Sequence, residues 1–221
     1  MRIAIVCFAL LLGACASGPV PPEWQSQSHA SLEKFKQHYL EGNSRLAERS
    51  FAEAKGALAS TGRPELVARA ELVRCALGTA ALDVDACQGF EDVKSDATAA
   101  DRAYADFVSG RLREQDAPML PEQYRAVAQA RDAGARNKAM QQIADPVSRL
   151  VAAGALFRLA QLSPQGLSAA VDTASAQGYR RPLLAYLDVQ ARVAESGGDS
   201  VALQSIRKRI DLVARSLPNS K

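Results

Sequence analysis

Residues 145–182 read DPVSRLVAAGALFRLAQLSPQGLSAAVDTASAQGYRRP. The spacing of the prolines and helix-capping residues in this stretch indicates how the chain folds. Pro146, Pro164 and Pro182 each stand where a helix can begin, because the first helical turn does not need the N–H that proline lacks. An aspartate and a serine precede the first two prolines, and both residue types cap helix N-termini. The starts are about 18 residues apart, which predicts consecutive helices of similar length joined by short turns.

The same pattern extends over the rest of the chain. Further helix starts are indicated at Pro64, Pro121 and Asp199-Ser200. Helix ends are indicated by Gly42, Gly62, Gly110, Gly178 and Gly197-Gly198. Apolar residues recur at helical spacing in four stripes: Leu32, Phe35, Tyr39; Ala47, Phe51, Ala54, Leu58; Leu66, Ala70, Val73, Leu77; and Leu203, Ile206, Ile210, Val213, Leu217. No long segment alternates with a period of two, and only 5% of residues are aromatic, so we expect an all-α protein.

The chain is large enough for one domain with its own core. It has 221 residues, of which 48% are apolar and 23% are charged. We expect the helical domain to span residues 23–217 and residues 218–221 to form a disordered tail. Asp83 to Ala97 and Arg113 to Pro121 are the least regular stretches and are predicted to be connectors.

One hairpin carries a family resemblance. Gly42-Asn43 is followed at fixed offsets by Ala47, Phe51 and Ala54. This order resembles the second half of a tetratricopeptide repeat (TPR), which has Gly-Asp, then alanine, an aromatic residue four later and alanine three after that. The first half departs from the pattern, because Phe35 lies where the repeat has glycine.

A weaker copy follows near the C-terminus, at Gly198-Asp199, Ala202 and Ile206. Two helices of about 18 residues also give a hairpin close to the period of this repeat. The resemblance implies a TPR-like α-solenoid of antiparallel helical hairpins. An irregular helical bundle is the alternative.

The N-terminus has the features of a targeting segment. Arg2 is followed by an apolar run from Ile3 to Leu12, which is shorter than the roughly 20 residues that span a bilayer. The run ends in Leu12-Gly13-Ala14-Cys15, which resembles the lipobox of bacterial lipoproteins. The resemblance implies that residues 1–14 are a signal peptide and that Cys15 carries fatty acyl chains such as palmitate. A signal peptide cut near Ala16 without lipidation is the alternative.

The residues after the lipobox indicate where the protein is held. Gly18-Pro19-Val20-Pro21-Pro22 is too rich in proline for a helix, so residues 15–22 are expected to form an extended tether. Ala16 stands where enteric lipoproteins retained in the inner membrane have aspartate. The resemblance therefore implies a lipid anchor in the outer membrane, with the body facing the periplasm.

Two cysteines remain in the body. Cys75 and Cys87 form an even pair in an oxidising compartment, which predicts a disulfide. A metal site or a catalytic thiol is the alternative, although no histidine lies near the pair.

Signatures of catalysis, metal binding and cofactor binding are missing. His29 and His38 are the only histidines, and on one helix they would point apart. Glu195-Ser196 matches the Glu-Ser start of the lytic transglycosylase motif, but the Gly-Leu-Met-Gln type sequence expected after it is absent. We therefore predict no catalytic residues, no metal site and no cofactor.

Charge gives one candidate contact surface. The chain has 27 basic and 24 acidic residues, a balance that argues against a nucleic-acid partner. Arg207, Lys208 and Arg209 form the clearest basic cluster and could contact lipid headgroups or an acidic partner. A solvated helix face is the alternative.

Together these patterns predict a lipid-anchored scaffold or adaptor that binds an envelope protein. Lipoproteins with TPR-like bodies include pilotins for secretins, β-barrel assembly subunits and adaptors for peptidoglycan hydrolases, and the overall pattern resembles proteobacterial lipoproteins. A peptidoglycan-acting enzyme using Glu195 is one alternative. A binder of lipid or another small apolar ligand is the other, with a cavity expected around Leu150, Leu156 and Phe157.

Overall fold

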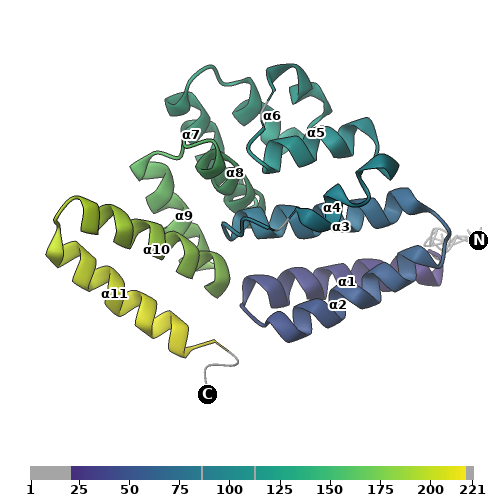
Figure 1. The fold of residues 1–221 in the computed structure, drawn as a ribbon, viewed down its shortest axis with the longest axis horizontal. Helices are drawn as coiled ribbons and strands as arrows, with labels where there is room; N and C mark the ends of the chain where they lie inside the picture. The colour runs from purple at the N-terminus through teal and green to yellow at the C-terminus, as the bar shows by residue number, and fades with distance from the viewer. Residues whose placement is uncertain (1–20, 86, 112, 218–221) are drawn as a thin grey trace, which may run out of the picture.

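Helices form all the regular structure of the part of the chain that the computed structural model describes, which is residues 21–85, 87–111 and 113–217. Figure 1 shows them arranged in an arc. In chain order they are α1 (Glu23–Leu40), α2 (Ser44–Ala59), α3 (Pro64–Ala80), α4 (Gln88–Glu91), η1 (Lys94–Asp96), α5 (Ala99–Val108), η2 (Glu114–Met119), α6 (Glu122–Gln129), α7 (Ala133–Gln141), α8 (Pro146–Arg158), α9 (Pro164–Ala176), α10 (Arg180–Ser196) and α11 (Ser200–Arg215). The all-α prediction is confirmed.

Several predicted features lie outside the described residues. They are the signal peptide at 1–14, the lipidated Cys15, the tether up to residue 20 and the tail at 218–221. Pro22, the last residue of the predicted tether, is the N-cap of α1. Within the described ranges, no helix has the length and apolar character needed to cross a membrane.

The helix starts and ends predicted from prolines, capping residues and glycines agree with most of the observed helix boundaries. Helices α3, α8 and α9 begin at the predicted prolines, and the side chains of Asp145 and Ser163 accept N-cap hydrogen bonds from backbone N–H groups. Five glycines have positive φ at helix ends: Gly42, Gly62, Gly110, Gly178 and Gly198. Two starts differ slightly. Pro121 is the N-cap of α6, which begins at Glu122, and α10 begins at Arg180, so that Pro182 is its third residue, still within the first turn that tolerates proline.

The described part of the chain has a helical hairpin at each end. In the first, α1 packs along α2, and the Phe35 and Phe51 ring centroids are 4.8 Å apart. The turn uses Gly42 at φ 81° and Asn43, whose side chain accepts a hydrogen bond from the Leu46 N–H. In the second, α10 packs along α11, and Asp199 caps the Ala202 N–H at 2.9 Å. Both hairpins lie where the sequence resembles the repeat.

Helix α3 is the centre of the structure, because it carries two buried faces. Ala70 and Leu77 face the core of the first hairpin, whereas Ala68, Leu72 and Cys75 belong to the larger core built with α5 to α10. The sequence stripe from Leu66 to Leu77 predicted only the first of these faces.

Helix α8 crosses α3 in very close contact. A Cβ atom added at Gly154 of α8 would lie 2.0 Å from the backbone oxygen of Thr79 on α3, so only glycine fits here. These helices are far apart in the sequence, whereas a repeat in a solenoid contacts only its neighbours. The helical-hairpin arrangement is therefore present, but the finer prediction of a TPR-like solenoid is not confirmed.

Two arginines bring the ends of the arc together. Arg180 Nε donates to the Glu41 carbonyl oxygen at 2.8 Å, and Arg181 Nε donates to the Tyr39 carbonyl oxygen at 2.9 Å. The Arg181 guanidinium also lies over the Tyr39 ring, 4.3 Å from its centroid. These contacts join the start of α10 to the turn between α1 and α2. Figure 1 shows these two parts of the chain facing each other.

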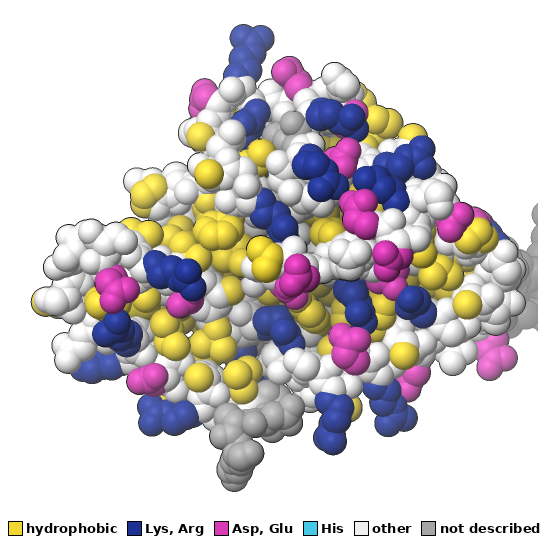
Figure 2. Space-filling model, in the orientation of Figure 1, with side chains coloured by type: hydrophobic (Ala, Val, Ile, Leu, Met, Phe, Trp, Pro, Cys, Tyr) yellow, Lys and Arg dark blue, Asp and Glu magenta, His cyan; other side chains and the backbone are white. Residues whose placement is uncertain are grey.

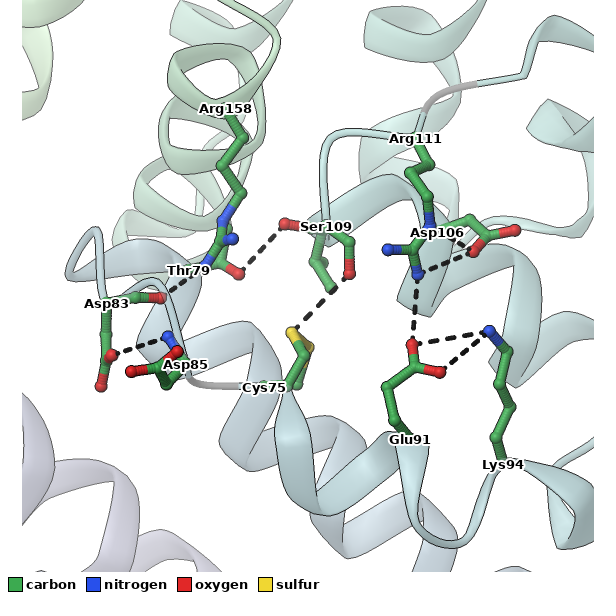
Figure 3. Close-up of a disulfide and its surroundings, with 12 residues drawn as sticks. Cys75, Thr79, Asp83, Asp85, Glu91, Lys94, Asp106, Ser109, Arg111 and Arg158 are labelled. Atoms are coloured by element: carbon green, nitrogen blue, oxygen red, sulfur yellow. Dashed lines mark hydrogen bonds and ion pairs between the residues drawn. A yellow bond between two sulfur atoms is a disulfide. The ribbon is translucent and has the colours of Figure 1, made fainter.

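The predicted disulfide links Cys75 of α3 to Cys87, which caps the short helix α4. Figure 3 shows Ser109 beside it, with its hydroxyl donating to the Cys87 sulfur at 3.8 Å. The connector from Asp83 to Ala97 is therefore tied to α3, as predicted, and contains the short helices α4 and η1.

Candidate interaction surface

An open apolar hollow lies between the end of α8, α9 and the hairpin of α10 and α11. Its volume is about 710 Å³. The apolar side chains that define it are Phe157, Leu162, Leu167, Val189, Val193 and Ile206. Phe157 is 40% exposed and Val193 is 59% exposed, which is unusual for large apolar residues side by side. Figure 2 shows hydrophobic side chains gathered where α9 and α10 lie in Figure 1.

A second hollow continues this surface along α10. Its volume is about 750 Å³, and it shares Phe157, Val189 and Val193 with the first. Leu82 and Val84 form its other wall, from the loop that follows α3. We call the two hollows together the apolar groove. Because they adjoin, the groove is elongated rather than a single rounded cavity.

Helix α10 supplies the floor of the groove because it has two apolar stripes. One stripe, with Leu183, Tyr186 and Leu187, is buried against the body, and the Tyr186 hydroxyl donates to the Leu150 carbonyl oxygen at 3.2 Å. Burial raises the pKa of Tyr186 well above its ordinary value, so it stays a neutral donor. The other stripe consists of Val189 and Val193, which lie one helical turn apart and face the groove.

Helix α11 forms the far wall while remaining incompletely covered. None of the residues Ser200–Arg215 is fully buried, because α11 packs mainly on α10. Its inner face contributes Ala202 and Ile206 to the groove.

The loop from Leu82 to Val84 is held in place by side chains of α8 and α1. Arg158 of α8 donates a hydrogen bond to the Asp83 carbonyl oxygen, and the Tyr39 hydroxyl donates to the Asp83 carboxylate at 3.4 Å. Figure 3 shows Arg158 reaching this loop beside the Cys75–Cys87 disulfide. Burial raises the pKa of Tyr39 to about 12, even though Arg181 opposes the shift. The hydroxyl therefore remains protonated and able to donate.

The predicted basic cluster lies on exposed turns of α11. Arg207 pairs with Glu195 of α10 at 3.3 Å, whereas Lys208 and Arg209 form no ion pair with any described residue. None of the three lines the groove.

The residues proposed for the alternative functions are not brought together. Glu195 is exposed in the last turn of α10 and ion-paired, so it lacks the dry pocket that a general acid needs. Leu150 and Leu156 are fully buried core residues, and of the three residues expected around a cavity only Phe157 reaches the groove.

The described lining of the groove is mainly apolar. Among the described residues, no group of three His, Cys, Asp or Glu side chains is placed to hold a metal ion. Comparisons with protein-family models, curated proteins and solved structures find no match. The sequence stripes did not predict the groove, because Val189 and Val193 form a short second stripe on α10 beside the longer buried one.

Proposed function

We propose that this protein is a lipid-anchored adaptor of the bacterial envelope that binds an amphipathic helix of a partner protein in the apolar groove. The observation that carries the proposal is the groove itself, an elongated apolar surface that spans two adjoining hollows and leaves Phe157 and Val193 uncovered. A helix laid in a hydrophobic groove is a recurring mode of recognition, in which apolar anchors from successive turns fill the hollows.

The rim of the groove supplies charges that would orient such a helix. Asp188 and Arg192 form an ion pair at 2.7 Å beside the second hollow, and Glu195 pairs with Arg207 near the first. Both pairs are exposed, so they stabilise the fold little and remain able to exchange partners. An apolar floor with a charged rim is typical of protein interaction surfaces.

The N-terminal sequence supports placement in the envelope. The tetrapeptide Leu12-Gly13-Ala14-Cys15 resembles a lipobox, and Ala16 favours the outer membrane. An anchored adaptor needs only modest affinity, because tethering raises the effective concentration of any partner in the same envelope. Secretins, β-barrel assembly complexes and peptidoglycan hydrolases are the partner classes that the resemblance suggests.

An apolar small ligand is the second candidate for the same groove. The hollows fall within the volume range of ligand sites, about 300–1,000 Å³. They are open and continuous rather than enclosed, however, and small-molecule sites bury most of their ligand. The extended shape therefore favours a helix.

The first test uses the full chain in its own cells, with gentle solubilisation and co-purification after crosslinking. Replacing Val193 with aspartate places a charge on the floor of the groove, and the 59% exposure of Val193 leaves the fold intact. We expect Val193→Asp to reduce recovery of the partner about tenfold or more, the usual cost of disrupting a central apolar contact. Met119→Asp is the control, because Met119 is an apolar residue that is 41% exposed on η2, outside the groove and outside α11.

A Cys15→Ala variant tests the anchor separately. We expect it to release the protein from membranes and to lower recovery of the partner. Equal recovery with Val193→Asp and Met119→Asp would rule out the groove as the binding site. Loss of a bound lipid, rather than a protein, in Val193→Asp would favour the ligand alternative.

A further inference from the structure

The outer face of α11 carries exposed apolar and basic side chains together. Val201, Lys208 and Leu212 stand at positions i, i+7 and i+11, which place them on one face of a helix. Val201 is 79% exposed and Leu212 is 68% exposed. This face points away from Ala202 and Ile206, the α11 residues that line the groove, so it is a separate surface.

The helix is also strongly basic. Ser200–Arg215 contains Arg207, Lys208, Arg209 and Arg215 but only one acidic residue, Asp211. Arg207 is engaged by Glu195, and Arg215 Nε donates to the Asp211 carbonyl oxygen. Lys208 and Arg209 are exposed without an ion pair to any described residue, so their charge is available to an anionic surface.

A second copy of the chain is a poor occupant of this face. Antiparallel pairing of Val201 with Leu212 of another copy would bring the two Lys208 side chains close to the symmetry axis. Parallel pairing in register would place the same lysines directly opposite each other. Like charges at such a contact are destabilising.

We propose that the outer face of α11 docks on the surface of a bilayer that contains anionic phospholipid. Val201 and Leu212 insert among the headgroups, and Lys208 between them contacts phosphates, as in interfacial helices that combine aliphatic and basic side chains. Arg209 adds positive charge from the side of the helix, about 80° away from this face. The contact is weak alone and rests on the proposed lipid anchor for its effective concentration. Of the three residues in the predicted basic cluster, this assigns the headgroup contact to Lys208, since Arg207 is paired with Glu195 and Arg209 lies to the side of the face.

Docking through α11 gives the groove a defined orientation. Since an α-helix with its side chains is about 10 Å across, the groove on the inner side of α11 would lie about that far from the bilayer surface. A partner helix that is itself close to the membrane would then reach the groove without a long linker.

The test measures the reactivity of Lys208 in the lipidated full chain. The protein is reconstituted in vesicles of phosphatidylcholine, with or without phosphatidylglycerol, and lysines are acetylated and quantified by mass spectrometry. We expect phosphatidylglycerol to slow acetylation of Lys208 about fivefold, and high salt to restore it. Lys138 is the internal control, because it is exposed on α7, which lies far from α11 in Figure 1.

Equal acetylation of Lys208 in both kinds of vesicle would overturn the inference. So would protection that appears only when soluble envelope proteins are added, because an acidic protein would then be the partner. The variant Val201→Ser/Leu212→Ser should lose most of the protection. The mass of the N-terminal peptide reports lipidation of Cys15 independently, so failure of the proposed anchor is distinguished from failure of the α11 contact.

Discussion

Replacing Gly154 with alanine is expected to lower the free energy of unfolding by about 3 kcal/mol, the upper part of the usual range for overpacking a core. The new Cβ would lie 2.0 Å from the Thr79 backbone oxygen and 2.7 Å from its carbonyl carbon. Backbone atoms at this crossing cannot move aside as a side chain end can, so α8 and α3 must separate. That separation would also disturb Thr79, whose hydroxyl donates to the Val108 carbonyl oxygen.

Gly56→Ala is the matched control for this experiment. Gly56 is inside α2, and a Cβ added there would meet nothing within 4 Å. Alanine should therefore stabilise the protein by up to about 1 kcal/mol, because it restricts the unfolded chain. Urea denaturation followed by circular dichroism measures both variants. A Gly154→Ala protein as stable as the wild type would show that α3 and α8 do not cross as closely as described.

Removing the disulfide is expected to have an effect of similar size. Cys75 and Cys87 are separated by 12 positions, and closing a loop of this length stabilises the fold by about 3 kcal/mol in the chain-entropy model. The loop between them contains Leu82 and Val84, which form one wall of the groove. The variant Cys75→Ala/Cys87→Ala should therefore lose both stability and affinity for the partner.

Reduction provides an independent check on the same bond. A dithiol reductant should lower the denaturation midpoint of the wild type and leave that of Cys75→Ala/Cys87→Ala unchanged. Identical midpoints for oxidised and reduced wild type would contradict the stabilising role of the disulfide.

The ends of the helices could be predicted from the sequence because local chemistry determines them. Pro146 and Pro164 begin α8 and α9, and Gly42 and Gly178 have the positive φ expected at helix ends. Each of these residues acts within one turn of its own position. The disulfide could be predicted for a similar reason, since its two cysteines are close in the sequence and have no other partner in the body.

The arrangement of the helices could not be predicted in the same way. The crossing of α3 and α8 depends on Gly154, which has the same appearance in the sequence as any glycine inside a helix. Nothing in the sequence around Arg180 and Arg181 indicates that their side chains donate to the carbonyl oxygens of Glu41 and Tyr39 at the end of α1. These contacts join residues far apart in the chain, and no local pattern encodes them.

The candidate site was only partly foreseen for the same reason. Phe157 was associated with a cavity, but its neighbours in space are Val189 and Val193 on another helix rather than Leu150 and Leu156. The three basic residues Arg207 to Arg209 were predicted as one cluster because they are consecutive in the sequence. On the helix, however, their side chains point in different directions: Arg207 pairs with Glu195, whereas Lys208 lies on the outer face.

Site-specific photocrosslinking in intact cells tests the groove most directly. A benzophenone amino acid is placed at Val193 in the groove or at Val201 on the outer face of α11, which are both well exposed. The adaptor proposal predicts a protein adduct of one defined mass from Val193, crosslinked through an amphipathic helix of the partner, and no such adduct from Val201. The same protein adducts from both positions, or no protein adduct from Val193, would contradict it.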